Sequence, residues 1–139
     1  MPVVRLTKRV QFAAGHRLHS AELSDAENAR IYGKCANPGG HGHNYRLEVT
    51  VEGEVDARTG MVVNFSALEG TIRTEVLDRF DHANLNTEVE PMRGLVPTAE
   101  NIAVVIWELL EPKLAPVRLV EITLAETESN IATYRGRGL

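Results

Sequence analysis

The sequence predicts an α+β domain in which two helices cover one face of an antiparallel sheet. Polar and apolar residues alternate in two segments near the start of the chain. Apolar residues repeat with helical spacing in two segments of the middle, and alternation returns near the end. The predicted order is therefore strand, strand, helix, helix, strand, strand. A length of 139 residues, 43% of them hydrophobic, fits a single domain over residues 1–139.

The first predicted strand covers residues 3–14 and has one buried face. Polar residues separate its alternating apolar residues, which are Val4, Leu6, Val10, Phe12 and Ala14. His16 continues the apolar row just beyond the strand. We therefore expect its imidazole to emerge at the end of the core-facing side, where other ligand-type residues would have to converge on it to make a site.

A short helix is predicted within residues 17–34, ahead of the second strand. Ser24 and Glu27 have the spacing of a capping box, and Gly33 is suited to end a helix. The helix leads the chain into a Pro/Gly-rich turn that contains the lone cysteine, Cys35.

Two histidines follow this turn, in the stretch GKCANPGGHGHNY over residues 33–45. Strand alternation is clear from Tyr45 onward, and His41 and His43 have the parity of its apolar face. Because side chains two residues apart in a strand point to the same side, both imidazoles are expected on one face.

The middle of the chain predicts a short returning strand at residues 61–63 and then the first of the two long helices. Ser66 and Glu69 have capping-box spacing, and an apolar stripe runs from Phe65 to Phe80. Asp81 and His82 come directly after this helix. Residues 84–97 form a loop of a length that is more often functional than incidental.

The last part of the chain predicts a second long helix and two strands. Thr98 is the expected N-cap of a helix that extends to about Glu111 and ends at Pro112. Residues 117–126 alternate again, and residues 131–135 form a last short strand. Glu126 ends the apolar row of the longer strand, where a carboxylate is costly unless it is paired or binds a ligand.

Composition excludes several classes of protein. The net charge of −4 and the aromatic content of 5% provide neither a basic tract nor a stacking platform, so no nucleic-acid partner is expected. The chain has no apolar run of membrane-spanning length and no apolar segment of a signal peptide at its start. A cytoplasmic protein with no membrane partner and no intrachain disulfide is expected.

Three of the histidines could form a metal site. In an antiparallel arrangement, the end of one strand can lie beside the start of its neighbour, so His16, His41 and His43 could meet. Three imidazoles suit zinc and leave a fourth position for substrate or water. Two alternatives stay open: Cys35 could complete a closed structural zinc site, or Glu126 could activate a zinc-bound water for hydrolysis.

Several motifs resemble the 6-pyruvoyltetrahydropterin synthase family, which also includes the 6-carboxytetrahydropterin synthases of the queuosine pathway. They occur in family order over nearly the whole chain and are AGHRLHS, GKCANPGGHGHNY, DARTGMVVNF, the Asp-His pair at residues 81–82, PTAEN at residues 97–101 and AET at residues 125–127. The resemblance implies a tunnelling fold (T-fold), a four-stranded antiparallel sheet with two helices on one face. It also implies a homohexamer made of two trimers, with active sites at subunit interfaces.

The resemblance assigns roles to individual residues. It implies that the zinc ligands are His16, His41 and His43 and that Cys35 is the base that removes a carbon-bound proton. Asp81 and His82 would form the relay that prepares this thiol. Glu126 would anchor the pterin ring, with Thr98 and Glu100 close to that anchor.

The implied reaction is that of a zinc-dependent lyase of tetrahydrobiopterin biosynthesis. It converts 7,8-dihydroneopterin triphosphate to 6-pyruvoyltetrahydropterin and releases triphosphate, for which Lys8, Arg9 and Arg17 are candidate ligands. Five residues separate Cys35 from His41, a spacing typical of the pyruvoyl-forming branch. The alternatives are a 6-carboxytetrahydropterin synthase, which releases acetaldehyde from the same substrate, and a non-enzymatic, zinc-stabilised binding module.

Overall fold

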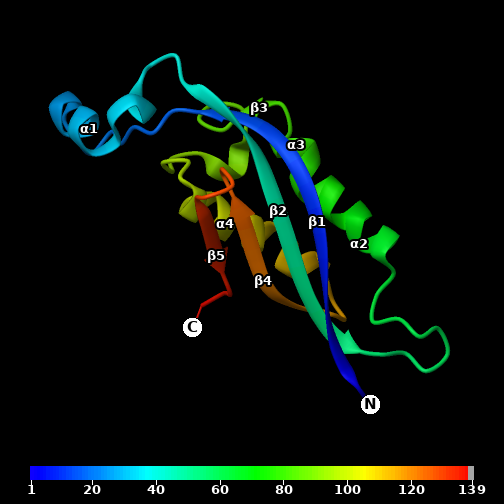
Figure 1. Ribbon diagram of the computed structural model, residues 1–139. Helices are drawn as coiled ribbons and strands as arrows, with labels where there is room; N and C mark the ends of the chain where they lie inside the picture. Colours follow the sequence, from blue (N-terminus) through cyan, green and yellow to red (C-terminus); the bar gives the residue numbers. More distant parts are fainter. Residues whose placement is uncertain (138–139) are drawn as a thin grey trace.

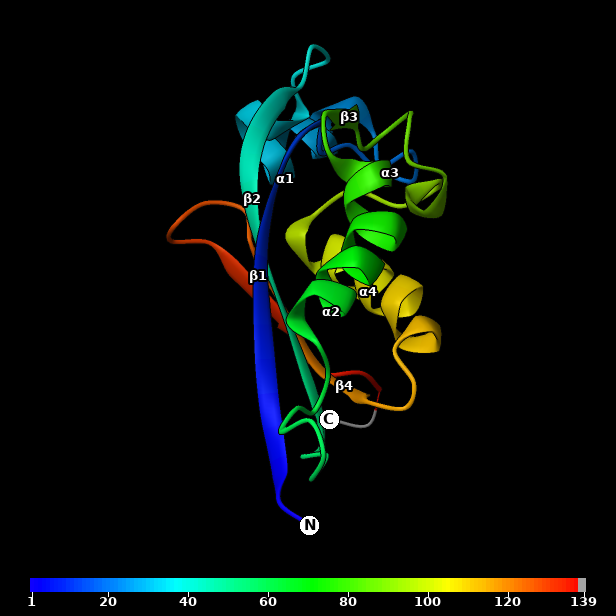
Figure 2. The same cartoon turned by 90° about the vertical axis from the view of Figure 1, so that its right-hand side faces the viewer.

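A five-stranded sheet with helices packed on one face forms the body of the protein (Figure 1). The computed structural model describes residues 1–137. The strand order is β3-β1-β2-β4-β5, and Figure 2 shows α2, α3 and α4 on one side of β1 and β2. The α+β class agrees with the prediction, whereas the sheet has five strands and not four. The predicted four-stranded sheet lacked β3 (Ala83–Asn84), which pairs in parallel with Ala14 and Gly15 of β1.

The two longest strands, β1 (Val3–His16) and β2 (His41–Glu54), pair along their whole length. Their ladder runs from Val3 opposite Glu54 to His16 opposite His41. β2 therefore begins at His41, and both histidines of the Gly-rich turn belong to the regular strand. Gly40 precedes it with φ +70°, and a Cβ there would lie 2.9 Å from the carbonyl oxygen of His16. Only glycine fits this turn without strain.

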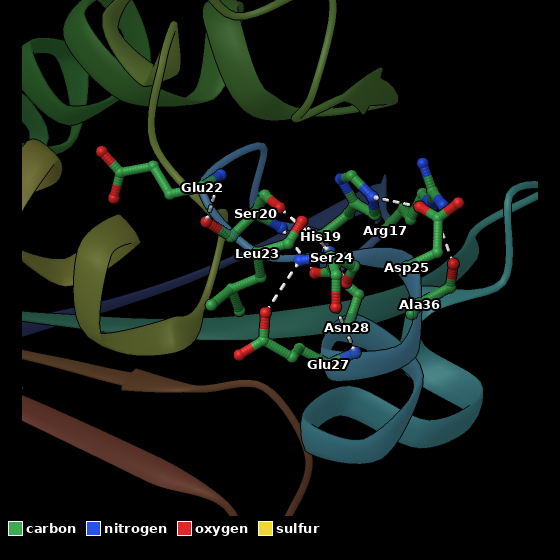
Figure 3. A network of polar contacts seen from close by, with 10 residues as sticks. All are labelled: Arg17, His19, Ser20, Glu22, Leu23, Ser24, Asp25, Glu27, Asn28 and Ala36. Atoms are coloured by element: carbon green, nitrogen blue, oxygen red, sulfur yellow. Dashed lines mark hydrogen bonds and ion pairs between the residues drawn. The ribbon is translucent and has the colours of Figure 1, made fainter.

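The excursion between β1 and β2 contains α1 (Asp25–Tyr32) and a 3₁₀ turn (Gly33–Ala36), as Figure 1 shows. The predicted capping box of Ser24 and Glu27 is present. Asn28 is buried and ties the start of the excursion together. Its Oδ1 accepts from the Ser20 N–H at 2.8 Å, and its Nδ2 donates to the carbonyls of Ser20, Leu23 and Ser24 (Figure 3). A loop without regular structure is thereby held in one conformation.

The first long helix consists of α2 (Phe65–Ile72), a π-helical turn (Arg73–Leu77) and α3 (Asp78–Phe80). The predicted capping box at Ser66 is wrong. The N-cap is Asn64, whose side chain accepts from the N–H groups of Ser66 and Ala67 at 2.8 and 3.3 Å. The helix therefore begins one residue before Ser66.

The predicted strand at residues 61–63 is also wrong, because these residues form a bend. β2 already pairs with β1 on one side and with β4 on the other, so no free edge remains beside it. A backbone hydrogen bond from Asp56 N–H to the carbonyl of Met61 closes the turn. Val63 then packs against the core.

The second long helix, α4 (Ala99–Leu110), has the predicted N-cap: the Thr98 hydroxyl accepts from the N–H of Asn101. The loop before it holds a 3₁₀ turn, Glu90–Met92, and a second such turn, Glu111–Lys113, follows the helix. β4 (Arg118–Ala125) and β5 (Ile131–Tyr134) complete the sheet. No helix within residues 1–137 combines the length and the apolar character needed to cross a membrane.

One hydrophobic core lies between the sheet and these helices. Phe12 stacks on Tyr45 at a centroid distance of 4.9 Å and meets Phe80 edge-on at 5.7 Å. The fully buried side chains include Leu47, Leu68, Ile72, Ile102, Ile106, Leu110, Ile122 and Leu124. The core reaches the end of the sheet at which the three histidines lie, so it provides a rigid base for them.

The opposite face of the sheet is polar. Arg5 and Arg118 both bind the carboxylate of Glu52, and Arg9 binds that of Glu48. Such exposed cross-strand pairs contribute little stability each, because solvent screens the two charges. They do, however, pair the guanidinium groups of Arg5, Arg9 and Arg118 with carboxylates.

Candidate metal centre

Three histidine side chains meet where β1 ends and β2 begins. His16 and His41 are register partners, and His43 follows two residues later on the same face. The ring centroids of the three pairs are 4.7, 5.1 and 4.9 Å apart, and one nitrogen from each ring lies within 4.8 Å of the others. The predicted convergence of His16, His41 and His43 is therefore present in the structure.

His16 is only 2% exposed, and its hydrogen bonds fix the role of each ring nitrogen. Its Nδ1 lies 2.8 Å from the carbonyl oxygen of Pro97, which accepts the Nδ1–H. The Tyr45 hydroxyl lies 3.3 Å from the same nitrogen. Nε2 therefore carries a lone pair and faces the Nε2 of His41 at 3.1 Å. A backbone carbonyl that orients an imidazole in this way is typical of metal sites.

Burial keeps two imidazoles of the cluster, those of His16 and His43, in the neutral form. Burial lowers the pKa of His16 and of His43 below the ordinary value of 6.5. The Nε2 of His43 is buried and has no hydrogen-bond partner among the described residues. Burial also raises the pKa of Tyr45, so its hydroxyl stays protonated beside the cluster. Neutral imidazoles with an unpartnered buried nitrogen fit a metal ion such as zinc.

Glu126 lies at the edge of the cluster, just after the end of β4. Its Oε2 is 3.9 Å from the Nε2 of His16, and its Oε1 is 3.8 Å from the Nε2 of His43. The carboxylate also faces a cleft of about 640 Å³, the Glu126 cavity, which Thr98 and Glu100 help to line. The structure thus brings together all three residues that were expected near a pterin.

Cys35 lies outside the histidine cluster, in the 3₁₀ turn that follows α1. Its carbonyl oxygen accepts from the N–H of Leu18 at 2.7 Å, and its side chain is partly buried. The described residues therefore do not form the closed site of one cysteine and three histidines. The cluster offers three nitrogen ligands, which is typical of zinc sites that keep one position open.

Asp81 and His82 are held against β1 rather than against Cys35. The N–H of Ala13 donates to Oδ1 of Asp81 at 2.9 Å, and the same oxygen lies 3.1 Å from Nδ1 of His82. The Ala13 N–H, followed by the His82 side chain, lowers the pKa of Asp81. Within residues 1–137, no hydrogen bond links this pair to Cys35, so one chain does not assemble the expected relay.

His82 has φ 62°, the left-handed region that non-glycine residues rarely adopt. Its N–H donates to the carbonyl of Ala13, and its side chain is 82% exposed. The backbone is therefore held in a strained conformation that points an accessible imidazole outward. Such strain is common at functional positions.

Sequence patterns missed two groups that position the cluster. The parity of Tyr45 with His43 is visible in the alternation, and it could have indicated that the phenol lies beside the imidazoles. The carbonyl of Pro97 is 81 residues from His16 in sequence, and a backbone group carries no residue-type signal.

Comparison with known proteins shows similarity over nearly the whole chain. The model of the 6-pyruvoyl tetrahydropterin synthase family matches residues 5–137. A Drosophila melanogaster protein named 6-pyruvoyl tetrahydrobiopterin synthase is 49% identical over 136 residues, which cover 97% of this chain and 81% of that protein. A more distant Archaeoglobus fulgidus protein, named as a putative 6-carboxy-5,6,7,8-tetrahydropterin synthase, is 36% identical over 84% of this chain and 91% of its own length.

A solved structure shows that the similarity extends to the fold. The structure of Caenorhabditis elegans 6-pyruvoyl tetrahydropterin synthase superposes with a TM-score of 0.93 at 44% identity. It covers 98% of this chain, which in turn covers 97% of that protein. A family match over nearly the whole chain, together with relatives at these identities, shows that the chain belongs to the 6-pyruvoyl tetrahydropterin synthase family.

Proposed function

We propose that this protein is a zinc-dependent lyase that converts 7,8-dihydroneopterin triphosphate to 6-pyruvoyltetrahydropterin and triphosphate. One observation carries the proposal: the three-histidine cluster has Glu126 at its edge and leaves Cys35 outside. A metal centre with three protein ligands supports catalysis, because a fourth position stays available to a substrate oxygen. The names of the relatives support the same reaction.

The proposed zinc ligands are His16, His41 and His43. Burial lowers the pKa of His16 and of His43, which favours their neutral forms, and the Pro97 carbonyl holds His16 with its Nε2 lone pair toward the cluster. Zinc bound there would supply Lewis acidity that makes the hydroxyls and adjacent C–H groups of the substrate side chain more acidic. The fold contributes rigidity, since the ligands lie on two fully paired strands.

Substrate recognition is assigned to Glu126, with Thr98 and Glu100 beside it. A carboxylate can accept hydrogen bonds from a ring N–H and an exocyclic amine at the same time. The pterin ring offers this pair of donors along one edge. In the Glu126 cavity it would be held next to the three histidines, so the side chain of the substrate would reach them.

Cys35 is the proposed base. As a thiolate it removes a carbon-bound proton of the substrate side chain, after which loss of triphosphate and tautomerisation give the 6-pyruvoyl product. The oxidation is internal to the substrate, so no redox cofactor is required. Asp81 and His82 are the proposed proton relay, with the carboxylate orienting the imidazole through their 3.1 Å contact.

We also propose a homohexamer of two trimers with active sites at subunit interfaces, in which each chain is a single domain. Two features support assembly. Within residues 1–137 no hydrogen bond joins the relay to Cys35, and β1 and β5 leave open edges on the two sides of the main sheet. A closed barrel of strands removes such edges. Native mass spectrometry and light scattering of the purified protein test the assembly.

The choice between two products follows from two observations. Five residues separate Cys35 from His41, as in the pyruvoyl-forming branch. The Drosophila melanogaster relative, named for a 6-pyruvoyl product, is 49% identical to this chain, whereas the Archaeoglobus fulgidus relative, named for a 6-carboxy product, is 36% identical. The test is incubation of zinc-loaded protein with 7,8-dihydroneopterin triphosphate, followed by identification of the products. Triphosphate release without acetaldehyde supports the proposal. Acetaldehyde with 6-carboxytetrahydropterin would establish the other branch, and no turnover would contradict both.

A further inference from the structure

We propose that the triphosphate group of the substrate binds in a second cavity, which reaches the histidine cluster at His16 and His41. This Arg17 cavity has a volume of about 470 Å³, and besides these two histidines its polar side chains are those of Arg17, His19, Asn84, Asn86 and Thr87. The inference rests on the proposed function, because it assigns the anionic end of the proposed substrate.

The two cavities beside the cluster have opposite charge. Among the described residues that line the Glu126 cavity, the ionisable side chains are the carboxylates of Glu100 and Glu126. The described lining of the Arg17 cavity has no carboxylate, and its cation is the guanidinium of Arg17. A pterin edge with N–H donors suits the first cavity. A triphosphate with several negative charges is repelled there and attracted in the second.

The other candidate cations of the first strand are already occupied. The Nζ of Lys8 lies 3.9 Å from a carboxylate oxygen of Glu69, and Arg9 binds Glu48 at 2.7 Å on the polar face of the sheet. Neither residue lines the Arg17 cavity. In contrast, Arg17 forms no ion pair with a carboxylate of residues 1–137. Of the three residues, only Arg17 combines a free charge with a position beside the cluster.

The Arg17 backbone and side chain are held in place before any ligand binds. The side-chain amide of Asn86 accepts from the Arg17 N–H at 2.7 Å and donates to the Arg17 carbonyl at 2.9 Å. The Nε of Arg17 donates to the carbonyl of Ala36 at 2.8 Å, a contact drawn in Figure 3. These bonds leave the terminal nitrogens of the guanidinium available to phosphate oxygens. A cation positioned in advance loses less entropy on binding.

The experiment measures binding of inorganic triphosphate to the zinc-loaded, full-length protein by calorimetry. Arg17→Gln is expected to weaken binding by about 10- to 100-fold, as loss of a charge-assisted hydrogen bond does. Arg58→Gln is the matched control. This substitution removes the same charge, and Arg58 is exposed in a turn beyond β2. Arg17 also supports the turn at Ala36, so its replacement can disturb the backbone as well as the charge. Thr87→Asp is therefore a second variant, which adds a negative charge to the cavity and leaves Arg17 intact.

Kinetics separate this inference from the proposed function. For 7,8-dihydroneopterin triphosphate, Arg17→Gln and Thr87→Asp should raise KM more than they lower kcat. Both variants should keep their zinc and their affinity for unphosphorylated neopterin. Triphosphate affinity equal to wild type in both variants, or no triphosphate binding by the wild type, would overturn the inference. Turnover by the wild type would still uphold the function in that case.

Discussion

The Nε2 atoms of His16 and His41 lie 3.1 Å apart because the two residues face each other across the last pair of the β1–β2 ladder. Their strands run antiparallel, so residues 25 positions apart in sequence are fixed as neighbours by backbone hydrogen bonds. With the Nδ1 of His16 donating to Pro97, the two nitrogens face each other at a position suited to a shared metal ion.

Replacing one of these imidazoles should abolish tight metal binding. We expect His41→Ala to lose zinc on dialysis, because two nitrogens remain where three are needed. The measurement is the zinc content by atomic emission after dialysis against a weak chelator. His19→Ala serves as the control. His19 is not part of the cluster, so this variant should keep its zinc. Zinc content equal to wild type in His41→Ala would contradict the assigned ligand set.

A methyl group at Gly40 should disturb the metal site through the backbone. Gly40 has φ +70°, and the new Cβ would lie 2.9 Å from the His16 carbonyl oxygen. The left-handed conformation alone costs about 1–2 kcal/mol for a residue other than glycine. We expect Gly40→Ala to lower the free energy of unfolding in urea by at least this amount and to weaken zinc binding. Gly39→Ala is the matched control, because nothing lies within 4 Å of its Cβ position.

Removal of the Cys35 thiol should separate catalysis from metal binding. We expect Cys35→Ala to keep its zinc and to lower kcat by about 10²- to 10⁴-fold, the usual contribution of a positioned base. The assay is product formation from 7,8-dihydroneopterin triphosphate with the zinc content measured on the same sample. A variant with full activity would eliminate Cys35 as the base, and one that lost its zinc would place the thiol among the ligands.

Neutralising Glu126 should affect the pterin end of the substrate alone. Glu126→Gln keeps the size of the side chain but replaces an acceptor oxygen with an amide donor, which cannot accept the second N–H of the ring. We expect the Kd for neopterin to rise about 10-fold or more, as for loss of a hydrogen bond to a charged group. The affinity for inorganic triphosphate should not fall. Equal losses for both ligands would show that Glu126 acts on the whole site.

Asp81 should stabilise the folded protein in a pH-dependent way. The Ala13 N–H holds the pKa of Asp81 below its ordinary value of 3.8, so the folded state favours the charged form. This stabilisation is fully present above that ordinary value and is lost as pH falls through the lower pKa of the folded state. The difference in urea unfolding free energy between wild type and Asp81→Asn should therefore shrink as pH falls below about 4. A difference that stayed constant would exclude the charge as its cause.

Period-two alternation predicted the histidine cluster because the alternation persists into the Gly-rich turn. His41 and His43 have the same parity as Tyr45. The β1–β2 ladder includes both histidines, so their side chains lie on the same face as that of Tyr45. The errors arose where two local patterns compete or where tertiary pairing decides. Asn64 and Ser66 are both acceptable N-caps, and the structure uses Asn64.

Non-local contacts were beyond the reach of sequence patterns. Residues 61–63 form a bend because β1 and β4 already pair with the two edges of β2, and no local sequence pattern encodes this pairing. The same is true of the Pro97 carbonyl on His16 and of the amide of Asn86 on Arg17, which join residues far apart in the chain. Such contacts orient the functional side chains, whereas the alternation only places them on a face.

The open edge of β1 links folding to concentration. β3 covers only Ala14 and Gly15, so residues 3–13 of β1 have a β-partner on the β2 side alone. An edge of this length is a template for another strand. Where a second chain pairs with it, association adds to the stability of the fold by mass action, and the melting temperature rises with protein concentration. Dilution would then weaken the sheet that carries the histidines as well as the assembly.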